Sequence, residues 1–249
     1  MTISATQWGS PTATRRALLI HGITMTSNSW EGLAQLLVAE APNLLAHAWR
    51  QGNTDYRISA FAEDLRPYFV MDTSYDVIIG HSFGGAVTVS LLPFLPKKKE
   101  TTVILLDPGL EFTEEQNKMN LNLFLKETAN IKPVNVHMAK NPAWSHRDCM
   151  LRTLGFSMCD RTAVEVFRVI LQLSEFHGFS GLLKKIPLHL KITVLVSDPK
   201  FGVGICNLEH IPRDVERLNV RALTGIGHWI QYECPDAIMD AIPLPRAKL

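Results

Sequence analysis

Cysteine is scarce in this chain, with four in 249 residues: Cys149, Cys159, Cys206 and Cys234. Four cysteines are too few for a disulfide scaffold in a chain of this length, and no two of them form a Cys-x-x-Cys pair, so a zinc site or a thioredoxin-type motif has no support. We therefore expect free buried thiols, and nothing else in the sequence implies a metal or a cofactor.

The chain also lacks an excess of charge and a long hydrophobic run. Lysine and arginine total 25 and aspartate and glutamate total 24, which gives a formal charge of +1. This balance argues against nucleic acid or an anionic membrane as a partner. No run of about 18 apolar residues exists and the N-terminus has no apolar leader, so we expect neither a membrane span nor a secretory signal.

Short apolar runs alternate with segments of helical period along most of the sequence. Strands are predicted at residues 16–20, 44–46, 76–79, 102–106, 192–196 and 220–223, and helices begin near Ser29, around Phe61, at Ala86 and near Pro235. Such alternation is typical of an α/β fold with a mostly parallel central sheet flanked by helices.

One stretch, residues 112–187, interrupts this alternation with helix-period sequence and no convincing strand. We interpret it as a helical lid or cap inserted into a core domain formed by residues 1–111 and 188–249. The insertion is rich in large apolar side chains, which predicts a pocket that favours an apolar acyl or polyketide-like substrate. They are Met119, Phe124, Met138, Trp144, Met150, Phe156, Met158, Phe167, Phe176 and Phe179.

The most informative motif is Gly80-His-Ser82-Phe-Gly84-Gly85, which matches Gly-x-Ser-x-Gly. An apolar strand precedes it and a helix of small residues follows it. This context indicates a sharp strand-to-helix turn that exposes the hydroxyl of Ser82 at the carboxyl end of the strand. Ser82 is therefore the candidate nucleophile.

A serine nucleophile needs a histidine base and a carboxylate that orients the histidine. His228 follows the last predicted strand and Asp198 follows the penultimate one, so their order with Ser82 is the one expected for a turn of this type. Asp107, at the end of another strand, and Glu111 are the alternatives for the acid. His81 is assigned to structural packing, facing away from the nucleophile.

Tetrahedral oxyanions in such sites are bound by backbone N–H groups. The residue after the nucleophile, Phe83, is one expected donor. The second is expected from the loop after the first predicted strand, at Ile23.

Taken together, these motifs resemble the α/β-hydrolase superfamily, in its small, lid-bearing class of serine hydrolases. The resemblance rests on His21-Gly22-Ile23, Trp30, Arg50-Gln-Gly52, the Ser82 motif, Val194-Leu-Val-Ser-Asp198 and Gly227-His-Trp-Ile-Gln-Tyr-Glu-Cys-Pro235. One departure is Ala46-His-Ala-Trp-Arg-Gln-Gly52, where relatives carry an acidic residue and an Arg-Gly-His-Gly turn. That loop lies beside the site in the family, so the departure concerns the shape of the substrate.

The resemblance implies cleavage of a carboxylic ester or thioester of a small-molecule acyl substrate, through a Ser-His-Asp triad and an acyl-enzyme. The same fold also supports two alternatives: a C–C bond or non-hydrolytic reaction (lyase, cyclase or acyltransferase), and a non-catalytic ligand receptor. The sequence leaves the substrate and the oligomeric state open.

The C-terminal tripeptide Ala247-Lys248-Leu249 differs by one residue from the Ser-Lys-Leu peroxisomal address. It predicts a peroxisomal location and the peroxisomal import receptor as a partner, which would fit a fungal member of the superfamily. Without this address, a cytoplasmic location is expected.

Overall fold

A seven-stranded sheet organises the computed structural model, which describes residues 4–10, 12–50, 55–69, 74–160, 178–201 and 204–243. The strand order is β1-β3-β2-β4-β5-β6-β7. Only β1 runs antiparallel to its neighbour, and the other pairs are parallel. The strands are β1 Ala5–Trp8, β2 Ala17–Ile20, β3 Ala39–Pro42, β4 Val77–His81, β5 Thr101–Leu106, β6 Leu190–Val196 and β7 Leu218–Ala222.

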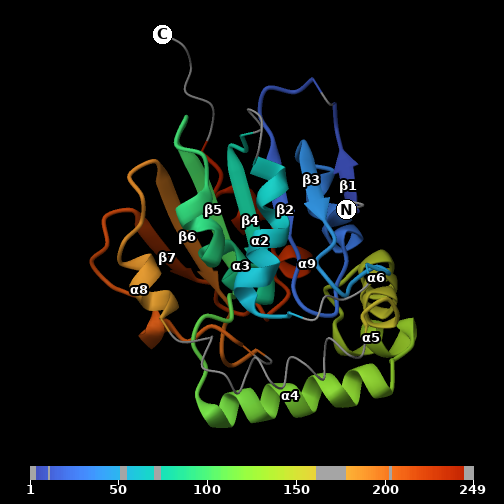
Figure 1. Ribbon diagram of the computed structural model, residues 1–249. Helices are drawn as coiled ribbons and strands as arrows, with labels where there is room; N and C mark the ends of the chain where they lie inside the picture. The colour runs from blue at the N-terminus through green and yellow to red at the C-terminus, as the bar shows by residue number, and fades with distance from the viewer. Residues whose placement is uncertain are drawn as a thin grey trace.

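Helices cover both faces of this sheet, so the predicted fold class is confirmed (Figure 1). The α-helices are α1 Glu31–Ala34, α2 Ile58–Leu65, α3 Phe83–Leu91, α4 Glu114–Ala129, α5 Val134–Lys140, α6 His146–Ser157, α8 Phe179–Leu183, α9 Ile230–Glu233 and α10 Pro235–Met239. Short 3₁₀ helices span Ser27–Trp30, Arg66–Phe69, Leu92–Phe94 and Leu208–His210.

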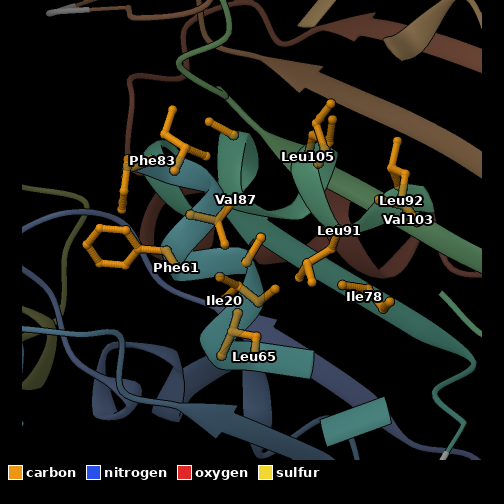
Figure 2. Close-up of a cluster of buried hydrophobic side chains, with 14 of the residues drawn as sticks. Ile20, Phe61, Leu65, Ile78, Phe83, Val87, Leu91, Leu92, Val103 and Leu105 are labelled. Atoms are coloured by element: carbon orange, nitrogen blue, oxygen red, sulfur yellow. The ribbon is translucent and has the colours of Figure 1, made fainter. Parts of the chain in front are cut away.

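Successive residues of the central strands alternate between two hydrophobic cores, as the two-residue period of a strand requires. Ile78 and Leu105 face the core under α2, α3 and α8, whereas Ile79 and Ile104 face the core under α1, α9 and α10. Figure 2 shows the first core, where Phe61 and Leu65 of α2 and Val87 and Leu91 of α3 lie over the sheet residues Ile20, Ile78, Val103 and Leu105. The central strands are thus buried on both faces, which explains their continuous apolar runs.

Two strands on one side of the sheet, the edge strand β1 and its neighbour β3, differ from the predictions. The strand predicted at 44–46 lies at Ala39–Pro42 instead, and residues 44–46 form the buried loop that follows it. Strand β1, Ala5–Trp8, was not predicted because its short polar sequence is only half-buried. Strand β1 pairs with β3, and β3 pairs with both β1 and β2. An argument from residue propensity does not detect such pairing.

Helices α4, α5 and α6 gather at one end of the sheet, within the predicted insertion (Figure 1). Helix α8 also falls inside that range, but it packs with the core domain, because its Phe179 and Leu183 are part of the hydrophobic core under α3. The division at residues 112 and 187 stays a prediction. Phe167 and Phe176 lie outside the described residues.

Several other predictions can be placed against the structure. All four cysteines are free thiols, as expected. Within the described segments, no helix is both long and apolar enough to cross a membrane. The tripeptide Ala247-Lys248-Leu249 lies outside those segments, so the peroxisomal address stays a prediction.

Candidate active site

Ser82 occupies a strained turn between β4 and α3. Its φ of 55° and ψ of −119° are rarely adopted by a residue with a side chain. The turn closes tightly because a Cβ on Gly80 would collide with Thr88 and one on Gly84 would collide with the carbonyl of Ile20. Glycine at both positions lets the backbone pack this closely, and Ser82 faces the cavity described below.

His228 lies in the loop after β7 and lines the same cavity as Ser82. Its Nδ1 is 2.6 Å from Oδ2 of Asp107. An ionised carboxylate only accepts hydrogen bonds, so Nδ1–H is the donor and Nε2 carries the lone pair. This is the tautomer that a general base needs.

Glu233 of α9 holds the loop that carries His228. One carboxylate oxygen accepts a hydrogen bond from Gly227 N–H at 2.6 Å. The other accepts one from Nε1–H of Trp144 at 3.2 Å, in the segment before α6. The loop is therefore fixed both by the element that follows it and by the predicted insertion.

Asp107 is fully buried at the end of β5, with a φ of 39°. Besides His228, its carboxylate accepts hydrogen bonds from the backbone N–H of Ile205 at 2.9 Å and from Oγ–H of Ser197 at 2.9 Å. Burial opposes ionisation, but the hydrogen bonds from His228, Ile205 and Ser197 outweigh it and lower the pKa of Asp107. The group is therefore an anion that steadies the histidine.

The prediction of Asp198 as the partner of His228 is wrong for this structure. The Asp198 carboxylate instead accepts hydrogen bonds from the backbone N–H groups of Lys200 at 2.9 Å and Gly225 at 3.0 Å, which lower its pKa. It closes the turn after β6 and joins that turn to the loop after β7. Glu111, the other alternative, accepts a hydrogen bond from Ser180 N–H at the start of α8.

The loop after β2, which contains Ile23, runs directly against the nucleophile. A Cβ added to Gly22 would lie 3.1 Å from the Cβ of Ser82, and Ile23 lines the cavity. Phe83 is the first residue of α3, and its ring packs edge-on against Phe61 at 4.9 Å. Both residues thus flank Ser82, and their role as oxyanion donors stays a prediction.

Two buried histidines fix this loop. His21 donates from Nδ1–H to Gly22 O at 2.8 Å and accepts at Nε2 from Leu44 N–H at 3.0 Å. His47 donates from Nδ1–H to Leu45 O and accepts at Nε2 from Thr24 N–H at 3.1 Å. Burial lowers the pKa of His47 to about 4 and places that of His21 well below its usual value. Both rings are therefore neutral, and His47 joins its own loop to the Ile23 loop by a direct hydrogen bond.

His81 does not face away from the nucleophile, as the sequence suggested. Its ring lines the cavity, lies 4.7 Å from the ring of His228, and donates from Nε2–H to the backbone O of His228 at 3.0 Å. Burial, followed by the nearby His228, keeps the pKa of His81 well below its usual value. It is a neutral brace for the His228 loop.

A cavity of about 270 Å³ lies above Ser82, between the carboxyl ends of the strands and the helices α4 and α6. Its lining is more polar than the sequence suggested. Phe124 does line it, but Met119, Met138 and Met150 are exposed, and Asn120, Glu127, Asn141 and Arg152 contribute polar groups. Arg152 was not singled out from the sequence, because a lone arginine on a polar helix gives no signal of burial.

Among the residues placed in the structure, no three His, Cys, Asp or Glu side chains cluster to hold a metal ion. The arrangement of Ser82, His228 and Asp107 suits nucleophilic attack on a carbonyl carbon.

Comparison with known proteins agrees with this fold. A family model described as "Alpha/beta hydrolase family" matches residues 17–241. Lipase LipV of Mycobacterium tuberculosis is 29% identical over 145 residues, which are 55% of this chain and 54% of LipV. An uncharacterized protein of Mycobacterium bovis is 33% identical over 99 residues, 37% of this chain and 29% of that protein. The chain thus aligns with about half or less of the length of these curated relatives.

Solved structures resemble the whole chain at low identity. MenH of S. aureus has a TM-score of 0.72 and 15% identity, covering 97% of both chains. The thioesterase domain of the curacin biosynthetic pathway has a TM-score of 0.71 and 19% identity, covering 96% of this chain and 94% of that one. The esterase EaEST of Exiguobacterium antarcticum has a TM-score of 0.72 and 13% identity, covering 96% and 95%. At these identities, the likeness concerns the fold.

Proposed function

The chain belongs to the alpha/beta hydrolase family, and from that premise we propose that it is a serine hydrolase that cleaves a carboxylic ester or thioester. The observation that carries the proposal is the hydrogen bond from His228 to the buried Asp107, since His228 lines the cavity that Ser82 faces. The esterase and thioesterase among the structural neighbours, and the lipase among the relatives, support the reaction class.

In this mechanism, His228 removes the proton of the Ser82 hydroxyl as the oxygen attacks the carbonyl carbon. Asp107 holds the imidazole in the required tautomer and stabilises the imidazolium that forms. The tetrahedral oxyanion is bound by the backbone N–H groups of Ile23 and Phe83. His228 then returns the proton to the leaving alcohol or thiol, which departs and leaves an acyl group on Ser82.

Hydrolysis of the acyl-enzyme uses the same groups, with water as the nucleophile and Ser82 as the leaving group. His228 takes a proton from water, the hydroxide attacks the acyl carbon, and the proton goes back to Ser82 as the acid is released. The braces around the His228 loop, Glu233 and His81, keep the base in place through both halves.

The test compares wild type, Ser82→Ala and Ser157→Ala on hexanoyl-CoA and on the 4-nitrophenyl ester of hexanoic acid. Ser157 is an exposed serine at the end of α6, so its substitution is the matched control. We expect Ser82→Ala to lower kcat by roughly 10³-fold or more, because the nucleophile is lost, and Ser157→Ala to leave it unchanged. The preferred leaving group separates a thioesterase from an esterase.

The alternatives give different results. Turnover that survives in Ser82→Ala would indicate acid–base chemistry by His228 without an acyl-enzyme, as in a lyase or C–C bond reaction. A folded wild type that hydrolyses neither substrate and binds them without turnover would favour a ligand receptor.

A further inference from the structure

Arg152 places a guanidinium in the wall of the catalytic cavity. It lies on α6, is only 4% exposed, and lines the cavity together with Ser82 and His228. Among the described lining residues, it is the only lysine or arginine. Burying a charge in this way is costly unless the charge is paired.

One nitrogen of the guanidinium, Nη1, is bound to the loop after β2. Nη1 donates to the carbonyl O of Thr24 at 3.0 Å and to its Oγ1 at 2.9 Å. The planar group also packs over the rings of Phe156, at 3.8 Å, and Trp229, at 4.2 Å. These contacts fix the orientation of the guanidinium beside the Ile23 loop.

The charge itself is poorly compensated. The ion pair to Glu127 joins Nη2 and Oε2 at 3.9 Å, beyond hydrogen-bond distance. The other oxygen of Glu127 is already 2.9 Å from Nζ of Lys132. Glu233, the other carboxylate on the lining, is occupied by Gly227 and Trp144. Burial lowers the pKa of Arg152 to about 10, and the nearby Glu127 offsets this only in part.

We infer that Arg152 binds a carboxylate of the substrate, so that the preferred substrate is an ester or thioester that also carries a carboxylate, such as a hemiester of a short dicarboxylic acid. This inference rests on the proposed function, whose Ser82 attacks the other carbonyl. A guanidinium presents parallel donors that match a carboxylate. Glu127 beside it repels a doubly charged phosphate more strongly than a singly charged carboxylate, because the repulsion grows with the charge of the ligand.

The experiment uses substrate pairs that differ only in that charge. The first pair is the 4-nitrophenyl hemiester of glutaric acid and its methyl-capped diester, which place the carboxylate in the acyl part. The second is 4-carboxyphenyl butyrate and its methyl ester, which place it in the leaving group. In one of the two pairs, we expect wild type to prefer the charged member by about 10- to 100-fold in kcat/KM, from charge-assisted hydrogen bonds in a desolvated site.

Variants then assign the preference to Arg152. Arg152→Gln should abolish it and Arg152→Lys should retain a part, mainly through KM. The inference is overturned if wild type treats both members of both pairs alike. It is also overturned if Arg152→Gln lowers all four rates by one common factor, which would show that the arginine only supports Thr24.

A binding measurement separates this inference from the proposed chemistry. Calorimetric titration of Ser82→Ala with monomethyl glutarate and with dimethyl glutarate requires no turnover. Tighter binding of the monoanion, lost in the Ser82→Ala/Arg152→Gln double variant, supports the anion site even if Ser82 proves not to be the nucleophile. Equal binding of the two probes, or binding of neither, contradicts it.

Discussion

Asp107 and Asp198 look alike in the sequence, because each lies within two residues of the end of a strand and each precedes a proline. Both strands end at the same edge of the parallel sheet, so position alone places either carboxylate near His228. In the structure, the two carboxylates differ in the backbone N–H groups that donate hydrogen bonds to them. Ser197 and Ile205, in the loop after β6, donate to Asp107, whereas the Asp198 carboxylate bonds to Lys200 and Gly225.

The sequence places Ser82 and His228 in the candidate site, where both line one cavity, because their neighbours in the chain constrain them. A glycine-flanked serine after a buried strand has few other roles, and His228 sits in a motif of its own. The acid, like Arg152, depends on which loop supplies donors and which helix covers the cavity, and one sequence does not show these long-range contacts.

The residue-scale prediction contrasts the two aspartates. Asp107→Asn should lower kcat/KM for the 4-nitrophenyl ester by roughly 10³- to 10⁴-fold, because an amide facing His228 Nδ1 no longer holds the required tautomer. Asp198→Asn should change it by less than about threefold, since this carboxylate bonds to Lys200 and Gly225 rather than to His228. The amide oxygen of asparagine can still accept one of these hydrogen bonds. Steady-state kinetics measures both, with thermal melting to show that each variant is folded. The reverse order of the two effects would restore Asp198 as the acid.

At the scale of elements, the junction of β4 and α3 is the most constrained part of the molecule. The buried strands β2, β4, β5 and β6 were predicted because their continuous apolar runs follow from burial on both faces. The edge strand β1 and its neighbour β3 carry no such run, and their pairing with each other and with β2 identifies them as strands. Predictability thus falls from the centre of the sheet to this edge.

Gly84 tests the packing of α3 on the sheet. A methyl group there would collide with the carbonyls of Ile20 and His21, which are backbone atoms that cannot rotate away. Gly84→Ala should therefore lower Tm by roughly 4–12 °C, from about 2–3 kcal/mol of overpacking. Gly32→Ala, on α1 with no atom within 4 Å of the new methyl, is the control. It should leave Tm unchanged or raise it slightly, because alanine favours a helix. Equal effects at both glycines would refute this account of the turn.

At the scale of the whole molecule, the site is assembled from parts distant in the chain. The sheet supplies Ser82, Asp107 and the loop with His228, while α4 and α6 supply the opposite wall of the cavity. The buried neutral histidines tie these parts together, since His21 and His47 hold the Ile23 loop and His81 holds the His228 loop.

Those histidines predict how stability depends on pH. The folded pKa of His47, about 4, lies below the ordinary value of 6.5. Between pH 6.5 and 4, His47 is therefore protonated in the unfolded chain and neutral in the folded chain. Stability should be complete above pH 6.5 and fall as pH decreases from 6.5 toward 4, with a slope of about 1.4 kcal/mol per pH unit for each such histidine.

Urea unfolding between pH 7 and pH 4 measures this dependence. In His47→Gln, the free energy of unfolding should fall less steeply with decreasing pH, by up to about 1.4 kcal/mol per pH unit. His146→Gln, at an exposed position on α6, should match wild type. Parallel curves for all three proteins would show that His47 is not held neutral by the fold.

The most direct test of the central claim is to map the site of reaction with a fluorophosphonate, which forms a stable adduct with an activated serine. The account predicts one label per chain, located by mass spectrometry on the peptide that contains Ser82. Labelling should be absent in Ser82→Ala and much slower in Asp107→Asn than in Asp198→Asn. A folded wild type that stays unlabelled, or that carries the label on another residue, would contradict the triad of Ser82, His228 and Asp107.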